Sequence, residues 1–306
     1  MVRLRTSCSI RSTDGRQSVP TILITGAAGG IGGQLVERAV ARGDTVFAVV
    51  REPAEQHRFR TAGNLQVVVM DVADTASVDL GFAEVDRLLA GQALDAIIHA
   101  AAISRPSAIE MSPVSDFEHI INTNAMGSLR VLKAAIPRLR GHAGRLILVT
   151  SLWGKASGSL LGAYCASKHA IESLADTARR ETAGMDLHII LVEPGVVKTQ
   201  MLSTQAPEVE SLLARMTAPQ EALYGNLYRR YAKLTAGAGR GAITAERCAA
   251  AIEKALSARN PRTRYRIGTD SKLVCFLAWA LPDRWMDGLM ALSLNHKPLN
   301  PTGKAG

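Results

Sequence analysis

The sequence predicts an α/β fold in which a doubly wound parallel sheet is covered by helices on both faces. From residue 21 onward, short apolar runs alternate with helical stretches, an order typical of parallel strands joined by crossover helices. Most of these runs are apolar throughout rather than at every second position, as expected for strands buried on both faces. A glycine-rich turn follows the first run, where such a sheet places a ligand-binding loop.

The individual elements follow from the apolar runs and from the glycines and prolines that end them. Together they predict a Rossmann-like catalytic domain over residues 20–258. Strands are expected over Thr21–Gly26, Thr45–Val50, Leu65–Met70, Ala93–His99, Arg145–Thr150 and Leu187–Val192, and helices over Gln34–Arg42, Ser115–Arg138 and Ala163–Ala183.

Composition narrows the class of protein. The 306 residues are 47% hydrophobic and 4% aromatic, so aliphatic side chains must fill the core. The net charge of +9 comes from the two ends, because residues 20–239 carry 21 basic and 21 acidic side chains; this argues against a nucleic-acid-binding core. The four cysteines stand singly, which indicates a reducing compartment, here the cytoplasm, without a metal site or disulfide framework. No apolar run reaches the roughly eighteen residues of a membrane span, and residues 1–19 are interpreted as a disordered tail, with a transit peptide as the alternative.

The glycine-rich turn has the features of a phosphate cradle. Gly26, Gly30 and Gly32 stand between a strand and a helix, where glycine lets the backbone turn tightly and approach a pyrophosphate. Free N–H groups at the start of the helix would face the anion. This context, more than the glycines alone, indicates a dinucleotide-binding site.

Tyr164 and Lys168 lie four residues apart, so a helix places both side chains on one face. An ammonium beside a phenol favours the phenolate, and we therefore expect Lys168 to lower the pKa of Tyr164. Ser151 follows the strand before this helix, which brings a second hydroxyl to the same end of the sheet. The three residues could move a proton onto a carbonyl oxygen. The alternative is a solvated tyrosine beside a solvated lysine.

Six motifs in the right order make the chain resemble the short-chain dehydrogenase/reductase family over Thr21–Leu256. One motif departs from the family pattern, because N-N-A-G after the fourth strand is replaced by His99–Ala102, H-A-A-A. We interpret His99 as a packing or hydrogen-bonding residue at the strand end, not as a catalyst. The matching motifs are T-G-x-x-x-G-x-G at Thr25–Gly32, Asp71 after the third strand, Asn124 in the long helix, Ser151, the Y-x-x-x-K of Tyr164 and Lys168, and P-G-x-x-x-T at Pro194–Thr199.

The resemblance implies an oxidoreductase that moves hydride between a nicotinamide dinucleotide and a carbinol or carbonyl carbon. Tyr164 would exchange the proton, Lys168 would hold the nicotinamide ribose, and Ser151 would bind the reacting oxygen. Asn124 would anchor a water in a proton relay. Taken singly, Asn124, Ser151 and Asp71 could equally serve as caps or bridges. The implied cofactor-binding residues are Gly26, Ala28, Gly30, Ile31, Gly32, Arg51, Asp71, Val72, Ala100, Tyr164, Lys168, Pro194, Gly195, Val197 and Thr199.

Cofactor preference is predicted from the end of the second strand. A carboxylate there binds the adenosine ribose and repels a 2′-phosphate, whereas a nearby arginine accepts that phosphate. Val50 stands where the carboxylate would be and Arg51 follows it; Glu52 should point away from Arg51 if the chain stays extended. Arg58 and Arg60 are interpreted as part of a solvated helix face. We therefore expect NADP(H) to be preferred over NAD(H).

The segment from about residue 200 to 241 is interpreted as a helical substrate lid, since the family keeps its lid there. Its apolar residues recur mostly three or four positions apart. Two interpretations are open. Either these residues contact a bulky lipophilic alcohol or ketone, of steroid, retinoid or long-chain type, or they only seat the lid on the core. Trp153 is interpreted as a pocket wall, with core packing as the alternative. The lid residues are Leu212, Leu213, Met216, Leu223, Leu227, Tyr228 and Tyr231.

Residues 259–306 are predicted to form a C-terminal appendage. A final short strand is expected within Asn260–Gly268, and one or two amphipathic helices within Lys272–Leu294. The basic excess at this end is compatible with peripheral contact to a membrane surface. Packing over the substrate mouth is the preferred alternative, so we expect the appendage to serve the substrate side rather than the cofactor side.

These observations predict an NADP(H)-dependent oxidoreductase, a homodimer or homotetramer, that interconverts a lipophilic alcohol and its ketone or aldehyde. The rival from another class is a catalytically silent dinucleotide-binding sensor or scaffold, because a fold alone does not secure activity. A sugar-nucleotide epimerase is the nearer alternative, since such enzymes share the tyrosine and lysine. The complete set of Asn124, Ser151, Tyr164 and Lys168 argues against the first, and the apolar lid against the second.

Overall fold

A computed structural model gives the structure of the chain and describes residues 19–59, 62–238 and 241–294. Its core is a seven-stranded sheet in the order β3-β2-β1-β4-β5-β6-β9, and all neighbouring strands run parallel. The chain winds outward from β1 in one direction and returns through β4 in the other, which confirms the predicted doubly wound α/β class. The strands are β1 (Thr21–Thr25), β2 (Thr45–Val50), β3 (Leu65–Val69), β4 (Ala96–His99), β5 (Gly144–Val149), β6 (Leu187–Pro194) and β9 (Arg264–Ile267).

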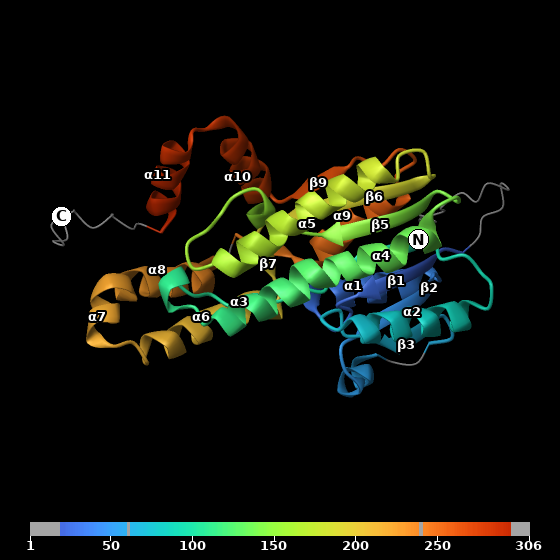
Figure 1. Ribbon diagram of the computed structural model, residues 1–306, viewed down its shortest axis with the longest axis horizontal. Helices are drawn as coiled ribbons and strands as arrows, with labels where there is room; N and C mark the ends of the chain where they lie inside the picture. The colour runs from blue at the N-terminus through green and yellow to red at the C-terminus, as the bar shows by residue number, and fades with distance from the viewer. Residues whose placement is uncertain (1–18, 60–61, 239–240, 295–306) are drawn as a thin grey trace, which may run out of the picture.

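Helices cover both faces of the sheet (Figure 1). Because strand side chains alternate between faces, Leu23 of β1 packs in the core beneath α2, α4 and α5, whereas Ile22 and Ile24 pack in the core beneath α1 and α9. The buried side chains of these helices close both cores; most are aliphatic, and Phe82 of α2 is aromatic. The helices are α1 (Gly30–Arg42), α2 (Thr75–Leu89), α4 (Gly127–Leu139), α5 (Gly162–Glu181) and α9 (Ala245–Ser257).

The long helix expected over residues 115–138 is interrupted. α3 (Val114–Ile121) and α4 are joined by the π-helical turn η3 (Asn122–Met126). A π-turn adds a residue to the helical repeat and often marks a functional site; here it contains Asn124. Strand β4 also begins three residues later than expected, at Ala96, and the Asp95 side chain before it accepts a hydrogen bond from the N–H of Thr21 through Oδ2.

The lid and the C-terminal segment lie at one end of the molecule (Figure 1). α6 and α8 pack against each other, and a small parallel pair, β7 with β8, ties the lid base to the start of α9; this pair was not predicted. The lid consists of α6 (Gln200–Leu213), α7 (Ala218–Gln220), the π-turn η5 (Glu221–Gly225) and α8 (Asn226–Ala238). The small pair is formed by β7 (Val197–Lys198) and β8 (Ile243–Thr244). Two helices follow β9, namely α10 (Thr269–Ala280) and α11 (Asp283–Ser293).

Three short 3-10 turns complete the elements: η1 (Pro53–Arg58), η2 (Ile109–Met111) and η4 (Leu152–Gly154). Among the described residues, none of the helices combines the length and the apolar character needed to span a membrane. The predicted tail, apart from its last residue, and the last twelve residues of the appendage lie outside the described residues, as does Arg60.

Candidate active site

The turn after β1 forms a cradle that admits only glycine at two positions. Gly26 has a φ of +66°, and a Cβ there would lie 2.8 Å from the Ala101 nitrogen. A Cβ on Gly32 would lie 2.1 Å from the Gly26 oxygen. α1 begins directly after this turn and has no acidic residue in its first turn, so its free N–H groups can face an anion.

The cradle opens into a pocket of about 1000 Å³ at the carboxyl ends of the strands. Every residue predicted to bind the cofactor lines this pocket. Of the four predicted catalytic residues, Ser151, Tyr164 and Lys168 line it and Asn124 does not. A crevice at this edge of a parallel sheet is where doubly wound folds bind dinucleotides, and the glycine cradle fits the pyrophosphate of such a cofactor.

Ser151, Tyr164 and Lys168 lie close together on the wall of the pocket. Ser151 caps the short turn η4, where its hydroxyl accepts a hydrogen bond from the Trp153 N–H at 3.2 Å, and a hydrogen bond joins its side chain to Tyr164. Lys168 is 2% exposed; its Nζ lies 5.5 Å from the centre of the Tyr164 ring and donates to the Val149 carbonyl at 3.0 Å. Two hydroxyls and one ammonium thus converge, as the spacing predicts.

We expected a lowered pKa for Tyr164, and for the protein by itself this expectation is wrong. Burial raises the pKa of Tyr164 to about 12, against the lowering effect of the Ser151 hydrogen bond. Burial also lowers the pKa of Lys168 to about 8, while the Glu172 carboxylate opposes this shift. Desolvation disfavours the charged form of both groups, and at Tyr164 it outweighs the hydrogen bond from Ser151.

Asn124 is fully buried and its amide is committed to neighbouring groups. Its Oδ1 accepts from the N–H of Ile103 at 2.9 Å, and its Nδ2 donates to the Ile103 carbonyl at 2.9 Å and to Ser167 Oγ at 3.0 Å. These bonds fix the loop after β4 against α5. The geometry therefore supports the bridging alternative for the side chain, and a water held by it in a relay remains a prediction.

His99 takes a structural place at the end of β4, as expected. Its Nδ1 lies 2.7 Å from Thr25 Oγ1 and its Nε2 lies 3.0 Å from Ser128 Oγ. The Ser128 hydroxyl donates to the Asn124 carbonyl at 2.6 Å, so Nε2 must be the donor to Ser128, and Nδ1 must accept from Thr25. Burial lowers the pKa of His99 to about 3, which keeps this ring neutral.

Two expectations at the adenosine end of the pocket need correction. Glu52 does not point away from Arg51; its Oε1 lies 2.9 Å from Arg51 Nη2. Arg58 is exposed, but its guanidinium reaches across the rim and donates to the Ala28 carbonyl at 2.8 Å. Asp71 lines the pocket while its Oδ1 accepts from the N–H of Ala73 at 2.9 Å; it caps a turn, and Asp74 rather than Asp71 caps the next helix.

The lid residues mostly seat the lid on the body. Of the predicted apolar stripe, only Tyr231 lines the pocket; Tyr228 is fully buried and its hydroxyl accepts from the Ala108 N–H at 2.7 Å, and Leu223 is exposed. Trp153 lines the pocket and also packs against the lid cluster, so both interpretations of it hold. The lid contributes other residues to the pocket wall: Met201, Leu202, Thr204, Gln205, Glu208, Leu234, Thr235 and Ala238.

Comparison with known proteins agrees with this site. Residues 20–210 match the family model described as short chain dehydrogenase. The chain is a short-chain dehydrogenase. It is 31% identical to human retinol dehydrogenase 16 over 88% of this chain and 87% of the relative, and 30% identical to human retinol dehydrogenase 5 over 90% of each. As a member of this family, the dehydrogenase acts on CH–OH groups with a nicotinamide dinucleotide.

Solved structures share the fold of this dehydrogenase. A short chain dehydrogenase from Burkholderia cenocepacia in complex with NADP superposes with a TM-score of 0.69 at 20% identity, over 92% of this chain and all of that one. Thermoplasma acidophilum aldohexose dehydrogenase gives a TM-score of 0.65 at 18% identity, over 83% of this chain and 94% of that one. At these identities the likeness establishes the seven-stranded architecture and leaves the substrate open.

The C-terminal segment of the dehydrogenase holds the loop after β6, which sequence reasoning missed. The Val196 N–H donates to Asp270 Oδ2 at 2.7 Å, Ser271 Oγ donates to the Glu193 carbonyl at 2.7 Å, and the Gly195 N–H donates to the Ile267 carbonyl. A Cβ on Gly195 would lie 2.0 Å from Asp270 Oδ1. The appendage therefore contacts the Pro194–Thr199 loop, which was predicted to bind the cofactor, and its service to the substrate side remains a prediction. A lone Asp after a short strand gives no sequence signal for this contact.

Proposed function

We propose that the dehydrogenase interconverts a lipophilic alcohol, of retinoid or steroid type, and its aldehyde or ketone, with NADP(H) as the preferred cofactor. One observation carries this proposal: the hydroxyls of Ser151 and Tyr164 and the ammonium of Lys168 meet in a pocket that has the glycine cradle at one end and the lid at the other. A bound nicotinamide dinucleotide supplies or accepts the hydride.

The side chains account for the proton and the developing charge. Ser151 and Tyr164 donate hydrogen bonds to the reacting oxygen, which stabilises negative charge as it forms. Tyr164 gives up its proton when a carbonyl is reduced and takes one when an alcohol is oxidised. Lys168, whose pKa burial lowers to about 8, carries the positive charge that favours the phenolate during this exchange.

The substrate class is supported by the pocket wall and by the relatives. Trp153, Leu161, Met201, Leu202 and Leu234 present apolar surface at the lid end. The two relatives cited above are named as retinol dehydrogenases. A shorter sugar-like substrate would leave much of this apolar surface exposed, which favours an elongated lipophilic one.

The preference for NADP(H) is supported by two arginines at the adenosine end. Arg51 and Arg58 both line the pocket there, and a guanidinium can bind a 2′-phosphate through two hydrogen bonds. The pair between Arg51 and Glu52 is exposed, and exposed pairs contribute only about 0–1 kcal/mol. A phosphate can therefore displace Glu52.

The double change Val50→Asp with Arg51→Ala tests this preference. It adds a carboxylate facing the ribose and removes one phosphate ligand, so kcat/KM should change from favouring NADP(H) to favouring NAD(H). Arg180→Ala, a change at an exposed position of α5, serves as the control and should leave the cofactor ratio unchanged. A wild-type enzyme that already favours NADH contradicts the proposed role of Arg51.

We further propose that the α10–α11 hairpin docks peripherally on a lipid bilayer. Trp279 is 82% exposed and Trp285 is 69% exposed, with Leu273, Phe276 and Leu292 also exposed beside them. Tryptophan and large aliphatic side chains are typical of the membrane interface. The predicted basic excess does not lie on the hairpin, because residues 269–294 carry two basic and three acidic side chains. Insertion of apolar side chains, not charge, is therefore expected to hold it.

Co-sedimentation with phosphatidylcholine vesicles tests the docking. Wild type should sediment to the same extent in low and high salt, and Trp279→Ser with Trp285→Ser should remain in the supernatant. Leu80→Ser removes an equally exposed side chain from α2 and is the control. Binding that disappears in high salt, or that survives the double change, contradicts the proposal. The homodimer or homotetramer implied by the family resemblance remains a prediction for light scattering.

A substrate panel tests the main proposal. All-trans-retinal, a ketosteroid, a long-chain aldehyde and an aldohexose are incubated with NADPH or NADH, and absorbance at the nicotinamide band is followed. Turnover of the lipophilic carbonyls with NADPH is expected. Binding of the dinucleotide without turnover of any carbonyl would indicate a silent sensor, and conversion of a sugar nucleotide without net cofactor oxidation would indicate an epimerase.

A further inference from the structure

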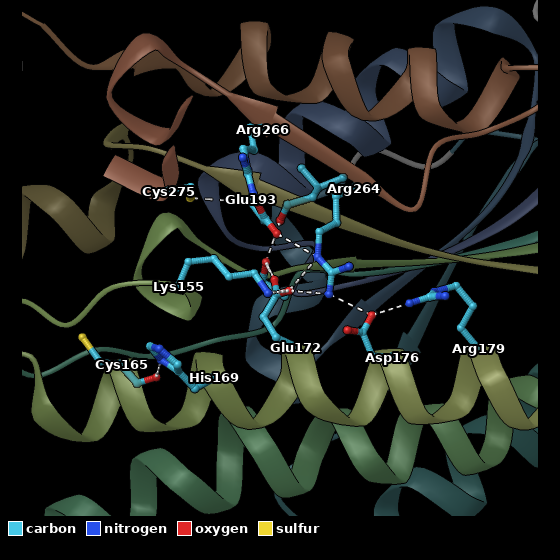
Figure 2. Close-up of polar contacts among 12 residues, drawn as sticks. Lys155, Cys165, His169, Glu172, Asp176, Arg179, Glu193, Arg264, Arg266 and Cys275 are labelled. Carbon is cyan, nitrogen blue, oxygen red and sulfur yellow. Dashed lines mark hydrogen bonds and ion pairs between the residues drawn. The ribbon is translucent and has the colours of Figure 1, made fainter. Parts of the chain in front are cut away.

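A buried carboxylate lies directly behind the catalytic residues. Glu172 is on α5, one turn beyond Lys168, and it is 3% exposed. Figure 2 shows it at the centre of a cluster of ion pairs that also includes Lys155, Arg264 and Glu193. None of these residues belongs to the catalytic set predicted from the sequence.

Glu172 binds the loop that carries Ser151 on both sides of that serine. Its Oε1 accepts from Thr150 Oγ1, the residue before Ser151, at 2.7 Å. Its Oε2 pairs with the Nζ of Lys155, four residues after Ser151, at 2.8 Å. One carboxylate therefore bridges both ends of this loop to the helix that carries Tyr164.

The loop also packs closely on α5 at this point. A Cβ on Gly154 would lie 3.0 Å from Glu172 Cγ and 3.2 Å from the Lys168 carbonyl. Arg264 of β9 completes the site, with its Nε 3.1 Å from Glu172 Oε2 and its Nη2 2.8 Å from Asp176 Oδ1. The carboxylate thus has a partner at each oxygen, as a buried charge requires.

We propose that Glu172 is a positioning residue for the reaction: it holds the Ser151 loop against the catalytic helix and supplies the counter-charge behind Lys168. The proposal rests on the catalytic roles proposed above for Ser151, Tyr164 and Lys168. Because Thr150 directly precedes Ser151 in the chain, a bond that fixes Thr150 also fixes the position of Ser151. A displacement of about 1 Å in a catalytic group is enough to reduce a rate strongly.

Several charged groups face Glu172, and their balance fixes the expected pH effect. Lys155, Arg264 and Lys168 carry the opposite charge, whereas Glu193 of β6 and Asp176 on the next turn carry the same charge; Arg266 pairs with Glu193 on its far side, beside the Cys275 thiol. Without the Glu172 charge, burial alone acts on Lys168. Lys168 would then lose its proton at a lower pH, and the alkaline limb of activity would move to lower pH.

Four variants test the inference: Thr150→Val, Thr150→Ser, Glu172→Gln and, as matched control, Asp176→Asn. Asp176 shares the helix face and Arg264 with Glu172, but its ion pairs are with Arg179 and Arg264 rather than with the Ser151 loop. Thr150→Val should lower kcat about tenfold, the effect of one lost hydrogen bond to a charged group, with the KM for NADPH unchanged. Thr150→Ser, which keeps the hydroxyl, should restore kcat. Glu172→Gln should move the alkaline limb down by roughly one pH unit.

Each outcome decides the inference. It is overturned if Thr150→Val and Thr150→Ser have the same kcat, if Glu172→Gln keeps the wild-type pH profile, or if Asp176→Asn reproduces the Glu172→Gln shift. If Glu172→Gln does not fold, the two Thr150 variants decide alone. Tyr164→Phe is measured alongside: an active Tyr164→Phe enzyme refutes the proposed function itself, whereas an inactive one with normal Thr150→Val refutes only the role of Glu172.

Discussion

Two buried polar networks flank the active site, one neutral and one charged. On the cofactor side, Thr25, His99, Ser128 and the Asn124 carbonyl form a chain of hydrogen bonds that contains no ion. On the catalytic side, Glu172 and its neighbours form ion pairs among residues from the Ser151 loop, α5, β6 and β9. Both networks fix the end of a strand against a helix.

The difference between them lies in how they respond to protons. The neutral network lowers the pKa of its histidine to about 3, first because burial excludes water and second because the Lys168 ammonium stands near. The charged network contains Glu193, whose pKa is raised by burial and by Glu172, beside Asp176, whose pKa is lowered by Arg264 and Arg179 against burial. The first network therefore sets the shape of the pocket, and the second also sets the charge that Lys168 experiences.

The largest effect should come from the site between the networks. Tyr164→Phe removes the proton donor but neither network, so we expect turnover to fall by at least ~100-fold, the low end for general acid–base catalysis. The affinity for NADPH, measured by fluorescence, should stay within the wild-type range. Full turnover in this variant would show that the proton comes from elsewhere.

The next largest effect should come from Asp270, which holds the loop after β6 through the Val196 N–H. Asp270→Ala leaves the Val196 N–H without its acceptor, and the loop that lines the cofactor pocket should loosen, so the Kd for NADPH should rise about tenfold. Asp270→Asn keeps an acceptor oxygen and should restore much of the affinity. Asp283→Ala removes an exposed acid from α11 as control. If Asp270→Ala, Asp270→Asn and Asp283→Ala all bind NADPH with the same Kd, the contact between Asp270 and Val196 does not contribute to cofactor binding.

A pH-dependent effect should distinguish the neutral network. The pKa of His99 is lowered to about 3 from an ordinary 6.5, so its contribution to stability is present above pH 6.5 and is lost as the pH falls toward 3. Between pH 7 and pH 5 this amounts to roughly 2 kcal/mol. Between pH 7 and pH 5, the free energy of unfolding should therefore fall by that amount less in His99→Asn than in wild type. His169→Asn, a change on the surface, should behave as wild type. The free energy of unfolding is measured by urea titration at both pH values. An equal change in this free energy for all three proteins would contradict the neutral assignment.

The residues that could be predicted from the sequence are those that act through local spacing. The glycine cradle, Ser151 and the Tyr164–Lys168 pair lie within one turn, one helix or one strand end, and the structure places them together. The substituted His99 was also interpretable, because a polar residue at the end of a buried strand needs a partner.

The rest depends on contacts between distant parts of the chain. Glu172 meets Arg264, and Val196 meets Asp270, across 92 and 74 positions respectively, and no periodicity in one sequence links such pairs. The lid stripe predicted helices correctly but could not tell which face meets the pocket, since Tyr228 and Tyr231 are both buried and only the latter lines it. Asn124 in the π-turn likewise bonds to Ile103, which lies 21 positions away in the loop after β4.

Transfer of a labelled hydride tests the central claim most directly. The wild-type enzyme is incubated with NADPH that carries deuterium at both C4 positions and with all-trans-retinal, and the alcohol product is examined by mass spectrometry and NMR. The account predicts one deuterium on the carbinol carbon, with the hydroxyl hydrogen coming from solvent, and no labelled product from Tyr164→Phe above about one hundredth of the wild-type rate. An enzyme that binds NADPH but yields no deuterated alcohol from this or the other lipophilic carbonyls would contradict it.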